Sequence, residues 1–286
     1  MTKKIFFVAL LTFIVVDLNA QSFLGWQMRD RYFSVQVGTG WTAYFGDLTN
    51  DHPISDGISH FNVGLEARLY SKVSVRAQYA TYRIEGSDAN AKYGTYNSQR
   101  NLAFRSVNKE WTIQGMYYFY KYNGIYHKRR TQEPYVAVGV GQTFYNPKAK
   151  YNGEWYELRD LHTEVGTYGK NTLIIPLAVG SKLTINEFVN LGIELGYRFS
   201  FSKHLDDISG NYATGHDDGS ISALLSNRST QLPIENESAA ASMLPGKSRG
   251  NGKADSYMLI NLSLEIFLPG DLFKENKGRK EKLFSK

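Results

Sequence analysis

The chain of 286 residues carries 33 lysine and arginine residues against 27 aspartate and glutamate residues, a formal net charge of +6. It contains no cysteine, which excludes disulfide bonds, a thiolate metal site and a lipoprotein signal. The small positive charge comes without a motif of interleaved basic and aromatic residues, so we do not expect nucleic-acid binding.

The amino terminus has the layout of a secretory signal peptide. Lys3 and Lys4 precede an apolar run from Ile5 to Val16, and Ala20 offers a small residue for cleavage. About twelve apolar residues are too few for a membrane-spanning helix, so an uncleaved anchor is the weaker interpretation. We therefore expect a signal peptide, a folded domain and a basic tail, over residues 1–20, 21–268 and 269–286.

Beyond residue 20 the chain is rich in aromatic residues and glycine, and its side chains alternate between apolar and polar. The clearest case is Leu191–Ser202, where the period of two extends over twelve residues. Such a period predicts a β-strand with one apolar face, and about 9–11 residues suffice for a tilted strand to cross a bilayer. A shift by one residue would turn Glu194 and Arg198 outward, at about 2–4 kcal/mol for the arginine near the bilayer midplane.

Eight segments share this pattern, which predicts eight strands. Pro176 lies in the sixth of them and cannot donate a ladder hydrogen bond, so we expect a bulge or a gap in pairing near it. In chain order the predicted strands are Tyr32–Phe45, Ser59–Tyr70, Val73–Ile84, Val107–Tyr120, Pro134–Tyr145, Thr172–Ile185, Val189–Ser202 and Asp255–Leu268.

The connections between these strands alternate between short and long. The long ones are polar, and we expect the last of them to be partly mobile; they cover residues 46–57, 85–106, 146–171 and 204–254. A soluble β-sandwich has no reason to separate its loops by length. We therefore predict an all-β fold, an eight-stranded antiparallel up-and-down transmembrane barrel in the outer membrane, with long outer loops and both ends in the periplasm.

The inward faces of these strands carry balanced charges. An eight-stranded barrel has an interior just wide enough for side chains, and a buried ion without a partner is costly. We therefore expect a salt-bridged plug, with a proton or ion path as the alternative. The inward charges are Glu66, Arg68, Arg76, Glu110, Lys182, Glu194, Arg198 and Glu265.

Catalysis has little support in the sequence. The six histidines show no metal-ligand spacing, and no strand places a serine beside a base, so we expect no enzyme, cofactor or metal. Outer-loop hydrolysis or calcium binding stays open as an alternative to turn residues that cap backbone amides. Its candidate residues are His204, Asp206, Asp207, His216, Asp217 and Asp218.

A basic turn follows the fourth predicted strand, on the periplasmic side of this topology. It is either a solvated face that maintains the topology or a docking site for an acidic periplasmic partner. Its residues are Lys121, Lys128, Arg129 and Arg130.

Several loop motifs resemble those of the PorG-like outer-membrane proteins of Bacteroidetes, in the same order over roughly residues 30–268. The residues singled out from the motifs are Arg100, Asn101, Phe104, Arg105, Glu164, Asp206 and Asp207. The motifs themselves are RNLAFRS (100–106), Thr163-Glu164, the strand 175–180, HLDDIS (204–209), Asn227-Arg228-Ser229 and Arg249-Gly250.

The resemblance implies a non-enzymatic component of the type IX secretion system, which supports gliding in many members. Such a barrel would associate with outer-membrane lipid and with the periplasmic ring formed by a lipoprotein and its partner, PorK and PorN, or GldK and GldN. It would not be the export channel, since eight strands enclose too narrow a lumen. The alternatives are a stand-alone barrel of adhesin or envelope-stabilising type and an outer-membrane lipid or peptide hydrolase.

Overall fold

The computed structural model describes residues 33–49, 53–121, 130–186, 188–217, 219–233 and 237–268. The predicted signal peptide, the basic tail, Lys128, Arg129 and Asp218 lie outside the described residues.

The described residues form ten strands, three short α-helices and three 3₁₀ turns. The strands are β1 (Phe33–Phe45), β2 (His60–Tyr70), β3 (Val73–Ser87), β4 (Ala103–Tyr118), β5 (Gln132–Phe144), β6 (Pro147–Tyr151), β7 (Glu154–Glu157), β8 (Asn171–Thr184), β9 (Val189–Ser200) and β10 (Ser256–Leu268). The helices are α2 (Tyr96–Arg100), α3 (Ile221–Ser226) and α4 (Glu237–Ser242), and the turns are η3 (Asp88–Asn90), η5 (Arg159–Leu161) and η6 (Ser229–Gln231). Over the part of the chain that is described, no helix has the length and apolar character needed to cross a membrane.

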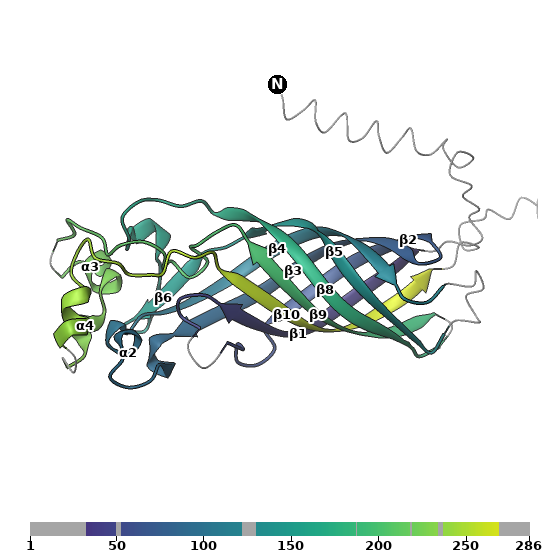
Figure 1. The fold of residues 1–286 in the computed structure, drawn as a ribbon, viewed down its shortest axis with the longest axis horizontal. Helices are drawn as coiled ribbons and strands as arrows, with labels where there is room; N and C mark the ends of the chain where they lie inside the picture. Colours follow the sequence, from purple (N-terminus) through teal and green to yellow (C-terminus); the bar gives the residue numbers. More distant parts are fainter. Residues whose placement is uncertain are drawn as a thin grey trace, which may run out of the picture.

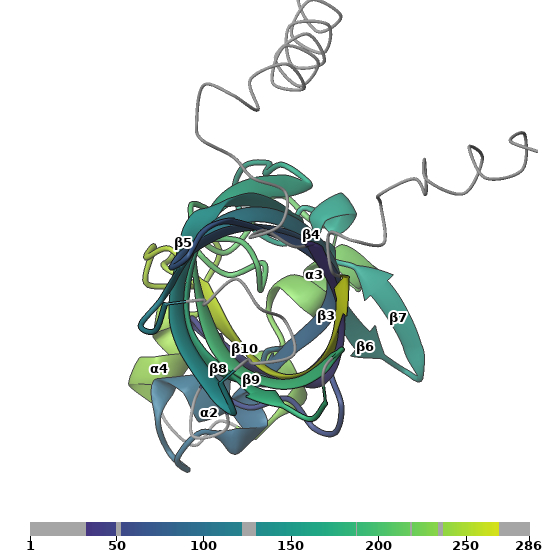
Figure 2. The same cartoon turned by 90° about the vertical axis from the view of Figure 1, so that its right-hand side faces the viewer.

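Eight of the strands close into an antiparallel barrel, which confirms the predicted fold class (Figures 1 and 2). The strand order is β3-β2-β1-β10-β9-β8-β5-β4, and pairing of β3 with β4 closes the ring. The remaining two strands, β6 and β7, form a hairpin that continues from the outer end of β4 and stands outside the wall in Figure 2.

The connections separate by length as predicted. Residues 71–72, 119–131 and 185–188 join strands at one end, where the barrel strands also begin at Phe33 and end at Leu268. The long connections gather at the other end, with α2, α3, α4 and β6 (Figure 1). We call these the inner and outer ends. Near Pro176 the ladder between β5 and β8 skips two pairs, from Val138↔Leu177 to Gly141↔Ile174, which confirms the predicted gap.

Two of the long connections contain more regular structure than predicted. Residues 85–106 are not all loop, because β3 and β4 stay paired out to Ser87↔Ala103, with Ile84 and Phe104 buried. Residues 146–171 contain the β6–β7 hairpin. In residues 204–254 the described part includes a folded layer, since Leu205, Tyr212, Leu225 and Met243 are buried in it; that part of this connection is mobile stays a prediction.

Outward-facing side chains give the barrel an apolar belt. Leu65, Ile113, Val138, Leu177 and Leu264 are all exposed. Exposed aromatic rings lie toward the outer end at Trp41, Phe61, Tyr79, Trp111, Phe144, Phe199 and Phe201, and toward the inner end at Phe33, Tyr70, Tyr117, Phe119, Tyr120 and Phe188. A band of aliphatic residues between two aromatic girdles is the exterior that lipid requires of a barrel.

Candidate functional site

Two polar regions stand out in this molecule. The lumen network consists of the eight inward charges predicted from the sequence and of Glu133, on β2, β3, β4, β5, β8, β9 and β10. The outer cap consists of the described parts of residues 46–59, 88–102, 145–170 and 201–255. All eight predicted lumen charges lie inside the barrel and are at most 3% exposed.

One lysine lies between two acids at the inner end of the lumen network. Lys182 Nζ is 2.6 Å from Glu66 Oε2 and 2.7 Å from Glu265 Oε1. Tyr118 donates to Glu66 at 2.5 Å, and Asn190 donates to Glu265 at 2.8 Å. The two carboxylates therefore share a cation and each gains a further donor, which reduces the cost of their burial.

Arginine–glutamate pairs occupy the rest of the lumen. Arg76 Nη1 lies 2.7 Å from Glu194 Oε2, and Tyr135 donates to the same oxygen at 2.7 Å. Arg198 Nη2 lies 3.1 Å from Glu110 Oε1, and Tyr257 donates to Glu110 Oε2 at 2.6 Å. These charges use side chains from opposite parts of the wall, so they tie the ring of strands together across its interior.

Arg68 has a partner that the sequence analysis missed. Its Nη2 lies 3.2 Å from Glu133 Oε2, and its guanidinium carbon lies 3.7 Å from the centre of the Tyr118 ring. Glu133 was missed because the predicted strand began at residue 134, one position later. The alternation of inward residues along β5 places residue 133 on the same face as Tyr135, and that signal could have found it.

Glycine makes room for these charges. A Cβ on Gly196 would lie 1.9 Å from Arg198 Nη1. The alternation of glycine with charged residues along β9 therefore reflects a lumen filled by large side chains. Side chains therefore occupy the space that an open, water-filled channel would need.

Arg249 is the hub of the outer cap. Its Nη1 donates to the Asp207 carbonyl at 2.6 Å and lies 3.4 Å from Glu164 Oε1, and its Nε donates to the Ser226 carbonyl at 3.2 Å. Glu164 also accepts from the backbone N–H groups of Ser209 and Gly210, at 2.8 and 2.9 Å. One buried guanidinium thus joins segments that lie far apart in the sequence.

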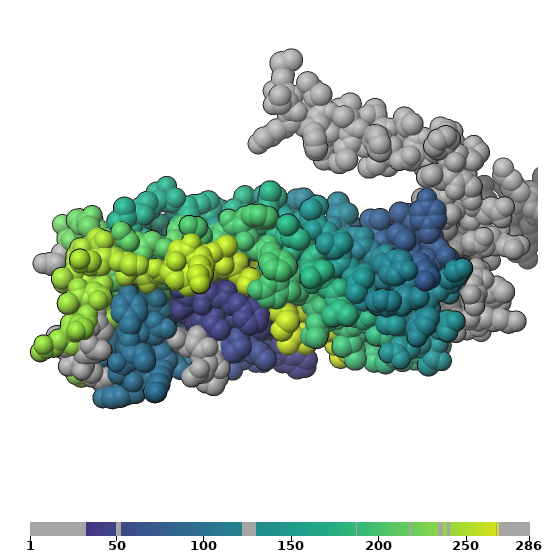
Figure 3. Space-filling model, viewed as in Figure 1, coloured from purple at the N-terminus to yellow at the C-terminus, as the bar shows by residue number. Residues whose placement is uncertain are grey.

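A second arginine ties α2 into the same cap. Arg100 forms a bidentate pair with Asp88, with Nε–Oδ2 at 2.7 Å and Nη2–Oδ1 at 2.8 Å. Its Nη1 donates to the Arg249 carbonyl at 3.0 Å and its Nη2 to the Asp47 carbonyl at 3.0 Å. Figure 3 shows the result, with the segment that leads to β10 lying across the outer end against the segment of α2.

Most residues singled out from the family-like motifs meet in this cap. Asn101 ends α2 in the left-handed conformation, at φ 56°, and donates to the Arg228 carbonyl at 3.3 Å. Phe104 is buried with its ring 5.0 Å from that of Tyr44. Arg105 is the exception, because it faces outward and pairs with Glu85 at 2.9 Å.

Two buried carboxyl groups of the cap, Asp206 and Asp255, interact with each other. Tyr44 donates to Asp255 Oδ1 at 3.0 Å, and Asp206 accepts from the Ile208 N–H at 2.9 Å. Burial, reinforced by the negative charge of Asp255, raises the pKa of Asp206 well above its usual range. Burial raises the pKa of Asp255 to about 7. The pair therefore holds protons near neutral pH, unlike the ion pairs of the lumen.

Of the residues considered for hydrolysis, His204, Asp206 and Asp207 are engaged in the cap's packing, whereas Asp217 is exposed and His216 Nε2 lies 3.1 Å from the His162 carbonyl. His204 stacks on Tyr168 with ring centres 4.5 Å apart, and burial lowers its pKa. Ser209 Oγ lies 3.1 Å from His204 Nδ1 and 3.2 Å from its Nε2, and Glu164 Oε2 lies 3.8 Å from Nδ1. A relay needs the acid hydrogen-bonded to the histidine, and here Glu164 is beyond that distance and accepts from the backbone N–H groups of Ser209 and Gly210 instead, so this trio is not arranged as a triad. Among the described residues no group of three or more histidine, aspartate or glutamate side chains could hold a metal ion.

The described residues of the basic turn lie at the inner end, at the opposite end of the barrel from the outer cap. Of its four residues only Lys121 and Arg130 are described, and both are exposed. The guanidinium carbon of Arg130 lies 4.6 Å from the centre of the Tyr120 ring. The structure therefore places these two cations beside the inner aromatic girdle.

Comparisons with known proteins find one family model and several solved structures of low sequence identity. A family model described as a domain of unknown function, DUF6089, matches residues 4–218. The chain is 7% identical to Neisserial surface protein A (TM-score 0.41; 82% of this chain and 96% of that chain). It is 8% identical to the attachment invasion locus protein Ail of Yersinia pestis, solved with the heparin analogue sucrose octasulfate (TM-score 0.38; 84% and 99%). It is 12% identical to a major outer membrane protein of Thermus thermophilus (TM-score 0.41; 83% and 99%). No curated protein matches the sequence.

Proposed function

This chain belongs to the DUF6089 family, and from that premise and its filled barrel we propose that it is a non-enzymatic, integral outer-membrane component of the type IX protein secretion system. In this role it anchors or organises the periplasmic ring of PorK and PorN type, or GldK and GldN type. The motifs of the cap, which resemble those of the PorG-like proteins, support the assignment to this system.

The filled lumen is the main observation in favour of a structural role rather than a channel function. Lys182, Arg76 and Arg198 pair with acids inside the barrel and are at most 3% exposed. Moving cargo or ions through this space would require breaking buried ion pairs, each at a cost of several kcal/mol. Reconstituted in a planar bilayer, the chain should therefore carry no large steady current, and a large one would contradict the plugged lumen.

Two surfaces of the barrel support this proposal. The outer wall supports its placement in the outer membrane, and the inner end supports docking of a periplasmic partner. The apolar belt between two aromatic girdles fits lipid, and both ends of the barrel emerge at the end with short turns. Lys121 and Arg130 are exposed at this end, and Lys128, Arg129 and the cationic tail lie next to it in the sequence. Cations in this position suit an acidic surface on a periplasmic partner.

Pull-down of the tagged chain from detergent, read by mass spectrometry, tests the proposal. Reversal of Lys128, Arg129 and Arg130 to glutamate should reduce recovery of the ring components several-fold. The matched control reverses three lysines of the outer end, Lys170, Lys203 and Lys247, and should leave recovery unchanged. Equal recovery with both variants would contradict docking through the basic turn.

A stand-alone barrel that acts at the cell surface is the second candidate. The observation in its favour is the outer cap, a folded layer whose buried residues Leu205, Ile208 and Leu225 pack in one cluster with residues at the outer ends of the barrel strands. In that case the tagged chain would come out of the membrane without ring components, while the cap would still be required for binding at the surface.

A further inference from the structure

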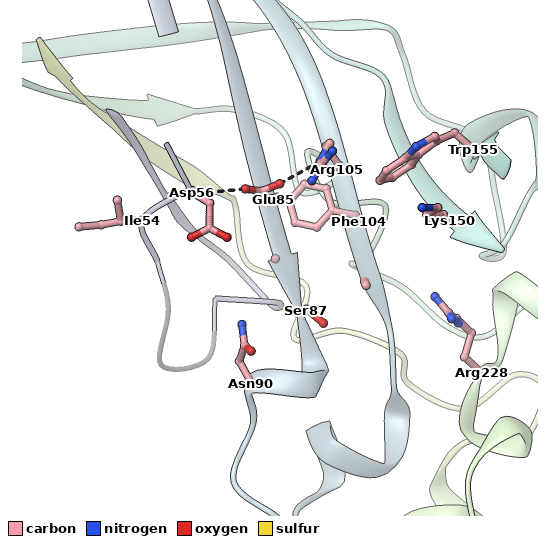
Figure 4. A pocket seen from close by; sticks show the side chains of 12 residues that line it. Ile54, Asp56, Glu85, Ser87, Asn90, Phe104, Arg105, Lys150, Trp155 and Arg228 are labelled. Carbon is pink, nitrogen blue, oxygen red and sulfur yellow. Dashed lines mark hydrogen bonds and ion pairs between the residues drawn. The ribbon is translucent and has the colours of Figure 1, made fainter. Parts of the chain in front are cut away.

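A cleft lies on the outside of the molecule, between the outer ends of β3 and β4 and the β6–β7 hairpin (Figure 4). Its volume is about 480 Å³, within the range of about 300–1,000 Å³ that small-molecule sites occupy. Its walls include Asp56, Glu85, Arg105, Lys150, Trp155 and Arg228. Neither the lumen network nor the docking face uses these side chains.

Of the two acids in the cleft wall, Glu85 is neutralised, whereas the Asp56 carboxylate is exposed to solvent. Glu85 Oε2 lies 2.9 Å from Arg105 Nε, and Glu85 Oε1 accepts from the Asp56 N–H at 3.2 Å. Arg83 Nη2 is a further 3.6 Å contact of Glu85. A cationic ligand would therefore have to compete with two arginines for this carboxylate.

The cationic side of the cleft has no such compensation. Lys150 on β6 and Arg228 between α3 and η6 have no acidic partner among the residues that the structure describes. Arg228 donates only to the neutral Gln231 side chain, at 3.3 Å, and its partial burial lowers the pKa of its guanidinium. A half-buried guanidinium in a cleft that a second cation also lines is a site where a bound anion is stabilising.

An aromatic ring forms the wall beside these cations. Trp155 lines the cleft and is 44% exposed, so part of its ring is open to a ligand. The guanidinium carbon of Arg105 lies 5.0 Å from its ring centre and holds the indole in place. Sugar rings place their C–H faces against exposed indole rings, and the Asn90 side chain on the opposite wall can bond to hydroxyl groups.

We propose that this cleft binds a phosphorylated sugar, with the phosphate between Lys150 and Arg228 and the sugar ring against Trp155. The cleft lies six residues beyond Trp111 of the outer girdle, about 20 Å along the tilted strand β4 and so about 15 Å above the girdle, since Arg105 is on the same strand. At that height it can be reached by the head group of an outer-leaflet glycolipid and by a free sugar phosphate. The proposal requires only that the barrel sits in an outer membrane, and not that it serves secretion.

Calorimetric titration of the full chain in detergent tests the site with three probes. These are lipopolysaccharide, the phosphorylated saccharide obtained from it by complete deacylation, and inorganic phosphate. We expect both saccharide-bearing probes to bind, and Lys150→Gln/Arg228→Gln to weaken them at least tenfold. Trp155→Leu should weaken the deacylated saccharide while leaving the weak binding of inorganic phosphate unchanged.

Lys170→Gln/Lys203→Gln is the matched control, because it removes two charges from exposed positions of the outer end that do not line the cleft. It should change affinity less than twofold. Heat-modifiable migration on gels confirms that each variant has a folded barrel. The proposal is overturned if the deacylated saccharide does not bind, if the cleft variant binds like the control, or if phosphate alone binds as tightly as the saccharide. Binding of intact lipopolysaccharide alone would mean contact through acyl chains on the barrel wall, and also overturns it.

Discussion

The lumen network and the outer cap bury similar polar groups, but they neutralise them in different ways. In the lumen each carboxylate faces a cation, as Glu194 faces Arg76 at 2.7 Å. In the cap Arg249 serves Glu164 and Asp207, while Asp206 and Asp255 lie together and are kept neutral by raised pKa values. The comparison shows that buried carboxylates in the lumen, where strand register fixes the positions of the side chains, are balanced by cations. In the cap, where loops meet, they are balanced partly by protonation.

Removing the central cation of the lumen should have the largest effect. Lys182→Met leaves Glu66 and Glu265 buried without the ammonium group that they share. Breaking one side of a buried ion pair costs about 3–5 kcal/mol, and here two acids lose their partner. We expect the free energy of unfolding to fall by about that amount, measured by denaturant titration of tryptophan fluorescence in lipid vesicles.

A triple variant provides the control for this prediction. Lys182→Met combined with Glu66→Gln and Glu265→Gln removes the charges together and should recover most of the loss. If the single variant were as stable as the parent, the shared lysine would not hold the lumen together.

Loss of the cap's hub should have a smaller and local effect. Arg249→Met leaves Glu164 and Asp207 buried beside the Thr163 side chain, without their guanidinium. We expect the cap to lose about 2–4 kcal/mol and to become sensitive to protease, while the barrel stays folded. Limited proteolysis followed by mass spectrometry should place new cleavages in residues 201–255, and Arg249→Lys should be intermediate. Cleavage of the barrel strands at the same rate would show that cap and barrel unfold as one unit.

The barrel could be predicted from the sequence because its signal is local. Alternation of apolar and polar residues identifies each strand and also which side chains face the lumen, as at Glu194 and Arg198. The same alternation continues to Ser87 and from Ala103, where polar loop-like composition hid it. The predicted ends of these strands were therefore wrong where the composition resembled a loop but the alternation of a strand continued.

The cap could not be predicted in this way. Arg249 pairs with Glu164 and Asp207, and Arg100 pairs with Asp88. These contacts depend on loop conformations, which have no periodic sequence pattern that could predict them. The αL conformations at Asn101 and Asp207, with φ 56° and 69°, are local features that depend on these contacts. The resemblance pointed to these residues, but only the structure shows that they form one connected layer.

The carboxyl pair predicts a pH dependence of the cap. Because the folded pKa of Asp255 is about 7, against 3.8 for the free side chain, the folded cap keeps a proton that the unfolded chain has lost. This stabilisation is complete below about pH 4 and is lost as pH rises toward about 7; the shifts at Asp206, Asp47 and Glu164 act in the same direction. For Asp255 alone this shift corresponds to about 3 kcal/mol between pH 4 and pH 7, and we expect the protease resistance of the cap to fall accordingly over this range.

Asp206→Asn isolates this contribution. The asparagine keeps an acceptor for the Ile208 N–H and carries no charge, so the slope of cap stability against pH should flatten. His204 works in the opposite sense, because its lowered pKa costs stability as pH falls below its usual value of 6.5. The difference between parent and variant removes this background. An unchanged slope would mean that the carboxyl pair does not control the cap.

The smallest effect is expected at an exposed pair with similar geometry. Lys148 Nζ lies 2.8 Å from Glu157 Oε1 on the β6–β7 hairpin, close to the 2.6 Å of the Lys182–Glu66 contact, but about 40% of each side chain is exposed. Water solvates both ions after the contact is broken, so Lys148→Gln should change stability by less than about 1 kcal/mol and less still at high salt. Denaturant titrations of this variant and of Lys182→Met in the same vesicles compare the two pairs directly. Equal losses would mean that distance rather than burial sets the contribution of an ion pair in this protein, and the distinction between lumen and surface would then not hold.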